Sequence, residues 1–258
     1  MELFELLDQK EAIANTPSTV YRFRATPQLP KNIFIYWHQG IRNAPEIVKL
    51  CAESWVKRNP TWNIKILNAT SAQRYLRATP EDYEISIQLY SDLLRLRLLE
   101  QYGGVWADAT CLCSAPLDDY IHWIIKNSGC FFFSHPGYDR IVASWFIAGT
   151  PKNPLITQWH RHLSEAITAH KKAQKEPPYF LCHYVFEHML QKASEEKEIY
   201  DNAAKIPAAP ALIAQRALAT DMDIGGLEDL FNYPVLKLTH KAALPMDRLR
   251  EVLERLGH

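Results

Sequence analysis

The chain has 258 residues, of which 47% are hydrophobic and 22% charged, and its 29 basic and 29 acidic side chains give a formal net charge of zero. This composition is ordinary for a globular protein, and a zero net charge excludes a global field that would attract nucleic acid or an anionic membrane. No apolar run approaches the roughly 20 residues that span a bilayer, and the acidic N-terminus is unlike a signal peptide. We therefore expect a cytoplasmic protein with at most peripheral membrane association, whose oligomeric state the sequence does not indicate.

The five cysteines are odd in number and include no C-x-x-C pair, which argues against a disulfide framework and against a structural zinc site. Cys111 and Cys113 would fit a soft metal site. Their spacing is better explained by alternate residues of one strand that face the same way, since free cysteine is among the most buried residue types.

Strands and helices alternate along the first half of the chain. After an N-terminal helix and lead-in over residues 1–30, the pattern predicts strands at Asn32–Trp37, Asn63–Leu67, Val105–Cys113 and Cys130–Ser134. It predicts helices at Pro45–Asn59, Ser71–Arg77 and Glu84–Tyr102. This alternation indicates an α/β protein with a mostly parallel sheet that is covered on both faces.

The second half is expected to be more helical, with helices at Pro154–Gln174, Tyr179–Ser194 and Met246–Leu256 and a loop at Lys171–Pro178. No break in composition demands a domain boundary. We therefore expect a single domain over residues 1–258, with the C-terminal helix in residues 244–258.

The most informative segment is SDLLRLRLLEQYGGVWADAT, residues Ser91–Thr110. Asp92 and Arg95 are three residues apart on a predicted helix and therefore share one face. Asp108 belongs to an apolar strand, where a carboxylate has little use except to meet a polar ligand or a metal. The segment predicts a binding or catalytic site.

The chain lacks the motifs G-x-G-x-x-G, G-x-S-x-G and H-E-x-x-H and the P-loop lysine motif. The segments that it does contain resemble those of the capsular polysaccharide synthesis glycosyltransferases, relatives of the family 32 sugar transferases and, more distantly, of glucosylating-toxin catalytic domains. The segments that carry this resemblance are FIYWHQG, S-D-x-x-R with Y-G-G-V-W-A-D, SWFIAGTPKNPLI, PYFLCHYVFEHML and KLTHK.

The resemblance implies a GT-A-like fold, in which a Rossmann-like mixed sheet that binds a nucleotide-sugar is flanked by helices. It also implies a donor that is usually UDP-linked, a divalent metal (Mn²⁺ or Mg²⁺), a glycan acceptor, and transfer of a hexose with retention of configuration. The resulting hypothesis is a hexosyltransferase of surface or capsular polysaccharide synthesis. Two alternatives stay open: a glycosyltransferase that acts on protein, and a nucleotide-sugar-binding module without activity.

By position, Trp37 matches the aromatic residue that stacks on uracil, and the alternative is a core residue. Asp92 and Arg95 match the residues that hold the donor hexose, and the alternative is an intrahelical ion pair. Asp108 matches the first aspartate of the D-x-D motif, which contacts ribose and metal. Trp106 is expected beside the nucleotide.

The second aspartate of that motif is replaced by Thr110, which gives D-A-T, and a hydroxyl is a poorer ligand than a carboxylate for a hard cation. His240 is our candidate for a further metal ligand and Lys241 is expected near the diphosphate, the alternative being a surface His-Lys pair. The acidic run at residues 221–229 could also supply a ligand, but a solvated loop explains it better.

His183 is the last candidate. On a helix, Tyr179, His183 and Glu187 would form one polar stripe that faces the acceptor. A structural histidine is the alternative.

Overall fold

A computed structural model describes residues 28–257, except residues 77, 80, 81, 83, 193, 194 and 221. The predicted N-terminal helix and most of its lead-in therefore lie outside the described residues. In this part of the chain no helix is both long enough and apolar enough to cross a membrane.

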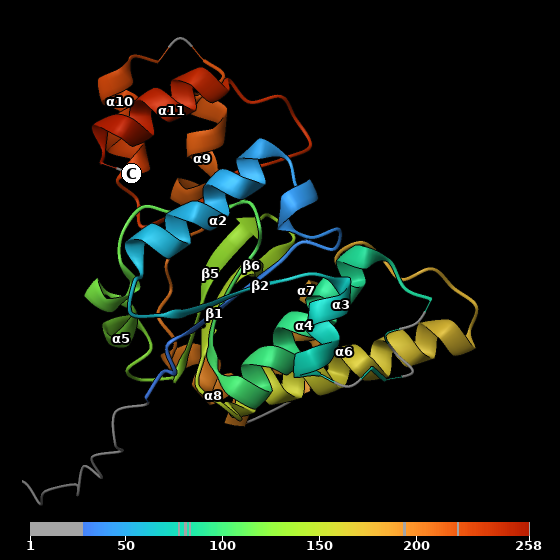
Figure 1. Cartoon of the computed structure of the whole chain (residues 1–258). Helices are drawn as coiled ribbons and strands as arrows, with labels where there is room; N and C mark the ends of the chain where they lie inside the picture. The colour runs from blue at the N-terminus through green and yellow to red at the C-terminus, as the bar shows by residue number, and fades with distance from the viewer. Residues whose placement is uncertain are drawn as a thin grey trace, which may run out of the picture.

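Figure 1 shows a central sheet between two groups of helices. Five strands form the main sheet in the order β2-β1-β3-β6-β5, and β4 pairs with β7 in a second sheet. The strands are β1 (Asn32–Tyr36), β2 (Asn63–Leu67), β3 (Gly104–Ala107), β4 (Cys111–Cys113), β5 (Cys130–Gly137), β6 (Arg140–Gly149) and β7 (Val235–Lys237).

One group of helices covers the face that carries Ile33, Ile35 and Val105. It consists of α2 (Glu46–Arg58), α5 (Ile121–Ile124), α9 (Ala209–Ala217), α10 (Ile224–Phe231) and α11 (Met246–Arg255), and two short 3-10 helices lie in the same half, η1 (Ile41–Asn43) and η3 (Leu117–Asp119).

The other group packs on Phe34, Trp106 and Phe132. It consists of α3 (Ala69–Tyr75), α4 (Ile87–Tyr102), α6 (Pro154–Lys172), α7 (Leu181–Lys192) and α8 (Glu195–Asn202). Successive residues of each core strand point into opposite cores because side chains alternate along a strand.

The α/β class, with a mixed sheet flanked by helices and a more helical second half, is confirmed. The expectation of a mostly parallel sheet needs correction, because β1 pairs in parallel with β2 and β3 whereas β6 is antiparallel to both β3 and β5. The reason is the β5–β6 hairpin, whose tight turn at residues 137–140 permits only an antiparallel pair.

The predicted strand Val105–Cys113 is in fact two strands in two sheets. β3 ends at Ala107, residues 108–110 form a turn in which the amide of Cys111 donates to the carbonyl of Asp108 over 2.7 Å, and β4 then pairs with β7. Asp108 and Thr110 therefore lie on a turn that connects the sheets. Cys111 and Cys113 are alternate residues of β4, buried as free thiols.

Candidate functional site

A cleft of about 690 Å³ opens where β1 and β3 end. Its walls come from the residues after β1, the first turns of α4, the turn after β3, the middle of β6, the start of α7 and the segment after β7. The carboxyl ends of parallel strands commonly form such ligand sites in α/β sheets. The cleft is lined by the predicted residues Trp37, Asp92, Arg95, Asp108, Thr110, His183, His240 and Lys241, whereas Trp106 and Glu187 are not among its lining residues.

Asp92 and Arg95 form a buried ion pair on α4. The Nη1 atom of Arg95 lies 3.0 Å from Oδ1 of Asp92, and each residue is only 4% exposed. The same Nη1 donates to the carbonyl of Ser144 on β6 over 2.7 Å. Burial raises the pKa of Asp92 to about 6, although Arg95 opposes that rise.

Asp108 is held through its Oδ1 atom and through its backbone N–H. Its Oδ1 accepts from the indole N–H of Trp106 over 2.9 Å and lies 3.3 Å from Nη2 of Arg95. Its backbone N–H donates to the carbonyl of Trp145 over 2.8 Å, and its side chain is 27% exposed. The carboxylate is therefore oriented by its neighbours while part of it stays open to the cleft.

Trp106 lies beneath the cleft. It is 1% exposed because β3 is the central strand and is covered on both faces, and the guanidinium of Arg95 lies 5.0 Å from its ring centroid. Its position beside the nucleotide stays a prediction, and its contacts make it a support of Asp108 and Arg95.

Lys237, for which the sequence predicts no role, contacts the D-A-T turn. Its ammonium donates to the hydroxyl of Thr110 and its Nζ lies 3.7 Å from Oδ2 of Asp108. The antiparallel pairing of β4 with β7 places Lys237 opposite Cys111, next to this turn. A pairing of residues 126 positions apart leaves no local pattern in a sequence, which is why this residue was missed.

These contacts do not fit a divalent metal at Asp108 and Thr110. Lys237 donates to the Thr110 hydroxyl and its Nζ lies 3.7 Å from Oδ2 of Asp108, while Arg95 faces the other oxygen. Within the described ranges no group of three or more His, Cys, Asp and Glu side chains could hold a metal ion. Divalent cations prefer several charged oxygens and would here face two cationic side chains instead.

Trp37 and His240 both line the cleft and contact each other. Their ring centroids are 5.0 Å apart and their planes are nearly perpendicular. The predicted metal ligand thus contacts an aromatic ring, and burial together with Lys237 and Lys241 lowers the pKa of His240. Lys241 extends over Tyr179, with Nζ 5.7 Å from the ring centroid, and also lines the cleft.

His183 lines the cleft from α7 with a buried Nδ1 that has no hydrogen-bond partner among the described residues. Burial first, and then Arg95 and Arg140, lower its pKa to about 4, so the imidazole is neutral at pH 7. The predicted polar stripe needs correction, because α7 begins at Leu181 and Tyr179 therefore precedes the helix.

The acidic run at residues 221–229 also needs correction, since most of it is helical. Asp223 caps the N-terminus of α10, where its side chain accepts from the amide of Gly226. A capping carboxylate is one of the common signals of a helix start.

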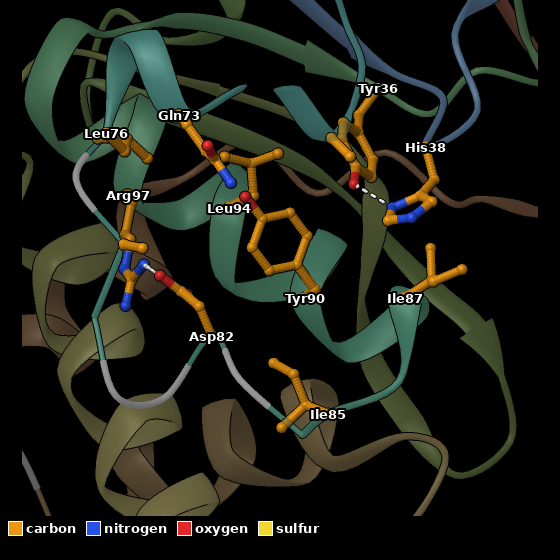
Figure 2. A pocket seen from close by; sticks show the side chains of 12 residues that line it. Tyr36, His38, Gln73, Leu76, Asp82, Ile85, Ile87, Tyr90, Leu94 and Arg97 are labelled. Carbon is orange, nitrogen blue, oxygen red and sulfur yellow. Dashed lines mark hydrogen bonds and ion pairs between the residues drawn. The ribbon is translucent and has the colours of Figure 1, made fainter. Parts of the chain in front are cut away.

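A second cavity, of about 230 Å³, adjoins the cleft at Tyr36 and His38. Figure 2 shows Tyr90 beside it and the ion pair between Arg97 and Asp82 on its wall, and the Tyr36 hydroxyl lies 2.8 Å from Nδ1 of His38. The charged side chains on this wall, Arg97 and Asp82, therefore pair with each other.

Comparisons with known proteins agree with the motifs. The family model described as "Capsular polysaccharide synthesis protein" matches residues 9–249. The O-glycosyltransferase braB of Annulohypoxylon truncatum is 29% identical over 151 residues, covering 50% of this chain and 36% of that protein. The glycosyltransferase afumC of Aspergillus fumigatus is 30% identical over 103 residues, covering 34% of this chain and 26% of that protein. The matches thus span roughly a third of the length of these curated relatives.

Two solved structures share low similarity with the chain. The PaToxG glycosyltransferase is 15% identical with a TM-score of 0.46, covering 90% of this chain and 87% of that one. The galactosyltransferase LgtC, in complex with donor and acceptor sugar analogues, is 13% identical with a TM-score of 0.43, covering 88% and 96% of the two chains.

Proposed function

Since the chain belongs to the capsular polysaccharide synthesis family, we propose that it is a glycosyltransferase that moves a hexose from a nucleotide diphosphate sugar, UDP-linked, to a glycan acceptor. Surface or capsular polysaccharide is the proposed product, formed with retention of configuration. The observation that carries the proposal is the convergence of Asp92, Arg95 and Asp108 in one cleft from α4 and the turn after β3. The names of the curated relatives support the same activity.

The donor sugar is assigned to Asp92 and Arg95. A carboxylate and a planar guanidinium that are fixed against each other offer acceptor and donor groups to sugar hydroxyls in one orientation. The bond from Arg95 to the carbonyl of Ser144 fixes that orientation against β6. Such positioning lowers the entropic part of the barrier to transfer.

The nucleotide is assigned to Trp37 and Asp108. Trp37 follows β1, is half-buried and lines the cleft, so a face of its indole can stack on a base. The open part of the Asp108 carboxylate can accept from ribose hydroxyls, and Lys241 provides a positive charge for the diphosphate.

The acceptor is assigned to the wall around His183. A neutral imidazole with an unpartnered nitrogen can hydrogen-bond an acceptor hydroxyl without a charge.

In the transfer, the bond between the anomeric carbon and the phosphate oxygen breaks, and its electron pair leaves with the diphosphate. The acceptor oxygen bonds to the anomeric carbon, and its proton passes to a diphosphate oxygen.

The test is a panel of nucleotide-sugars in which thermal shift and release of free nucleotide diphosphate are measured for the wild type and Asp108→Asn. Binding raises the melting temperature because the ligand binds only the folded state. We expect one donor to be turned over by the wild type and turnover to fall at least about 100-fold in the variant. Asp247→Asn, at a fully exposed carboxylate on α11, is the matched control.

The same assay separates the alternatives. Unchanged turnover in Asp108→Asn would contradict the assignment of the site. Binding without turnover of any donor, with or without added glycan, would favour a nucleotide-sugar-binding module. Transfer to protein but to no glycan would favour a protein-directed enzyme.

A further inference from the structure

Lys237 has a defined position at the D-A-T turn. It is the last residue of β7, whose pairing with β4 aligns Lys237 with Cys111, and its neighbour Leu238 donates a backbone hydrogen bond to the carbonyl of Thr110 over 2.9 Å. Val235 and Leu236 are fully buried, so the strand that carries the lysine is anchored in the core. The backbone on both sides of the contact is therefore fixed.

The side chain of Lys237 brings one positive charge to two oxygen atoms. Its Nζ donates to Oγ1 of Thr110 and lies 3.7 Å from Oδ2 of Asp108. The residue lines the cleft and its side chain is 21% exposed, so the ammonium can also reach a ligand there. An ammonium has three donors, and the two contacts described leave at least one for that ligand.

Thr110, which stands in place of the second aspartate of the D-x-D motif, is a suitable partner for the ammonium of Lys237. A hydroxyl is a neutral acceptor for an ammonium, whereas a divalent cation prefers charged oxygens at that position. With Arg95 on the other oxygen of Asp108, the carboxylate already lies between two cationic side chains.

We propose that Lys237 takes the place of the divalent cation in this chain and that its ammonium, held by Thr110 and Asp108, binds the diphosphate of the donor. This inference rests on the proposed function, because it assumes that a nucleotide diphosphate occupies the cleft. It makes donor binding independent of added metal.

The test is calorimetric titration of UDP, GDP and ADP into the wild type, Lys237→Met and Lys237→Arg, each in EDTA and in Mn²⁺. We expect the wild type to bind one nucleotide with affinities that agree within about twofold in EDTA and Mn²⁺. Lys237→Met should bind about 10- to 100-fold more weakly in EDTA, the range for loss of one charge-assisted contact. Lys237→Arg, which keeps the charge, should lose less than Lys237→Met.

Lys49→Met, at an exposed lysine of α2, controls for the loss of one surface charge, and the melting temperature of each variant checks its fold. Titration of Mn²⁺ alone, followed by electron paramagnetic resonance, supplies a readout besides nucleotide binding, and we expect no stoichiometric binding by the wild type. A wild type that needs Mn²⁺ to bind nucleotide, or a folded Lys237→Met that binds as well as the wild type in EDTA, would overturn the inference and leave the proposed function intact. A wild type that binds no nucleotide in either buffer would overturn both.

Discussion

The imidazole of His240 and the indole of Trp37 are nearly perpendicular to each other, with the ring centroids 5.0 Å apart. His240 follows the short strand β7 and Trp37 follows β1, so this contact joins the two sheets across the cleft. Perpendicular aromatic pairs are favourable, and Trp37 lines the cleft, where its indole offers an aromatic surface to a planar ligand.

Trp37→Leu should therefore weaken the binding of UDP by about 1–3 kcal/mol, the usual contribution of a base stacked on an aromatic side chain. Calorimetric titration of UDP into the wild type and the variant measures this loss. Trp123→Leu is the matched control, since Trp123 is 74% exposed and does not line the cleft. Equal affinities for wild type and Trp37→Leu would assign Trp37 to the core alone.

Asp92 should make stability depend on pH. Because its pKa is raised from 3.8 to about 6 by burial, the folded state keeps this proton when the unfolded chain has lost it. The contribution of Asp92 to the free energy of unfolding is thus greatest at low pH and decreases as the pH rises through 4 to 6. Asparagine does not titrate, so the stability of the wild type relative to Asp92→Asn should fall by about 2–3 kcal/mol between pH 4 and 7.

Urea unfolding of both proteins at several pH values measures this difference. If the wild type instead gains relative stability as the pH rises, then the attraction of Arg95 outweighs the burial of the carboxylate.

His183 should show the opposite dependence. Burial lowers its pKa from 6.5 to about 4, so the unfolded chain takes up this proton first as the pH falls. The contribution of His183 to stability is complete above pH 6.5 and is lost between pH 6.5 and 4. Relative to His183→Gln, the wild type should lose about 2–3 kcal/mol over that interval in the same urea experiment. A relative stability that does not change with pH would mean that the imidazole is solvated.

The sequence predicts those parts of the site that depend on local spacing. Asp92 and Arg95 are three residues apart on a helix, and the structure does bring their side chains together. The strand Asn63–Leu67 and the end of α4 at Tyr102 are also predicted correctly, because an alternating apolar run and a glycine cap are local signals.

The features of the site that depend on the pairing of distant strands could not be predicted from the sequence. The contact of Lys237 with Thr110 requires β7 to lie beside β4, and the burial of Trp106 requires β3 to be the central strand. The strand β6 was missed because its residues are almost uniformly buried, and an apolar run without alternation does not separate strand from helix.

Gly104 lies where strands β1 and β3 approach each other closely. It begins β3 at a φ of 110°, and a Cβ atom there would lie 2.4 Å from the carbonyl oxygen of Asn32 on β1. An outlying φ costs about 1–3 kcal/mol and overpacking costs a similar amount. Because the clash is with backbone, Gly104→Ala should destabilise the protein by several kcal/mol, measured by urea unfolding.

Gly257→Ala separates the cost of the positive φ from the cost of the steric clash. Gly257 also has a positive φ, 68°, but a Cβ atom there would meet nothing within 4 Å. We expect this control to lose no more than about 1–2 kcal/mol, the cost of the left-handed conformation alone. Similar losses in the two variants would mean that β1 and β3 can separate enough to admit a methyl group. In that case Asp108, which follows β3, would not be held as rigidly as its hydrogen bonds to Trp106 and Trp145 indicate.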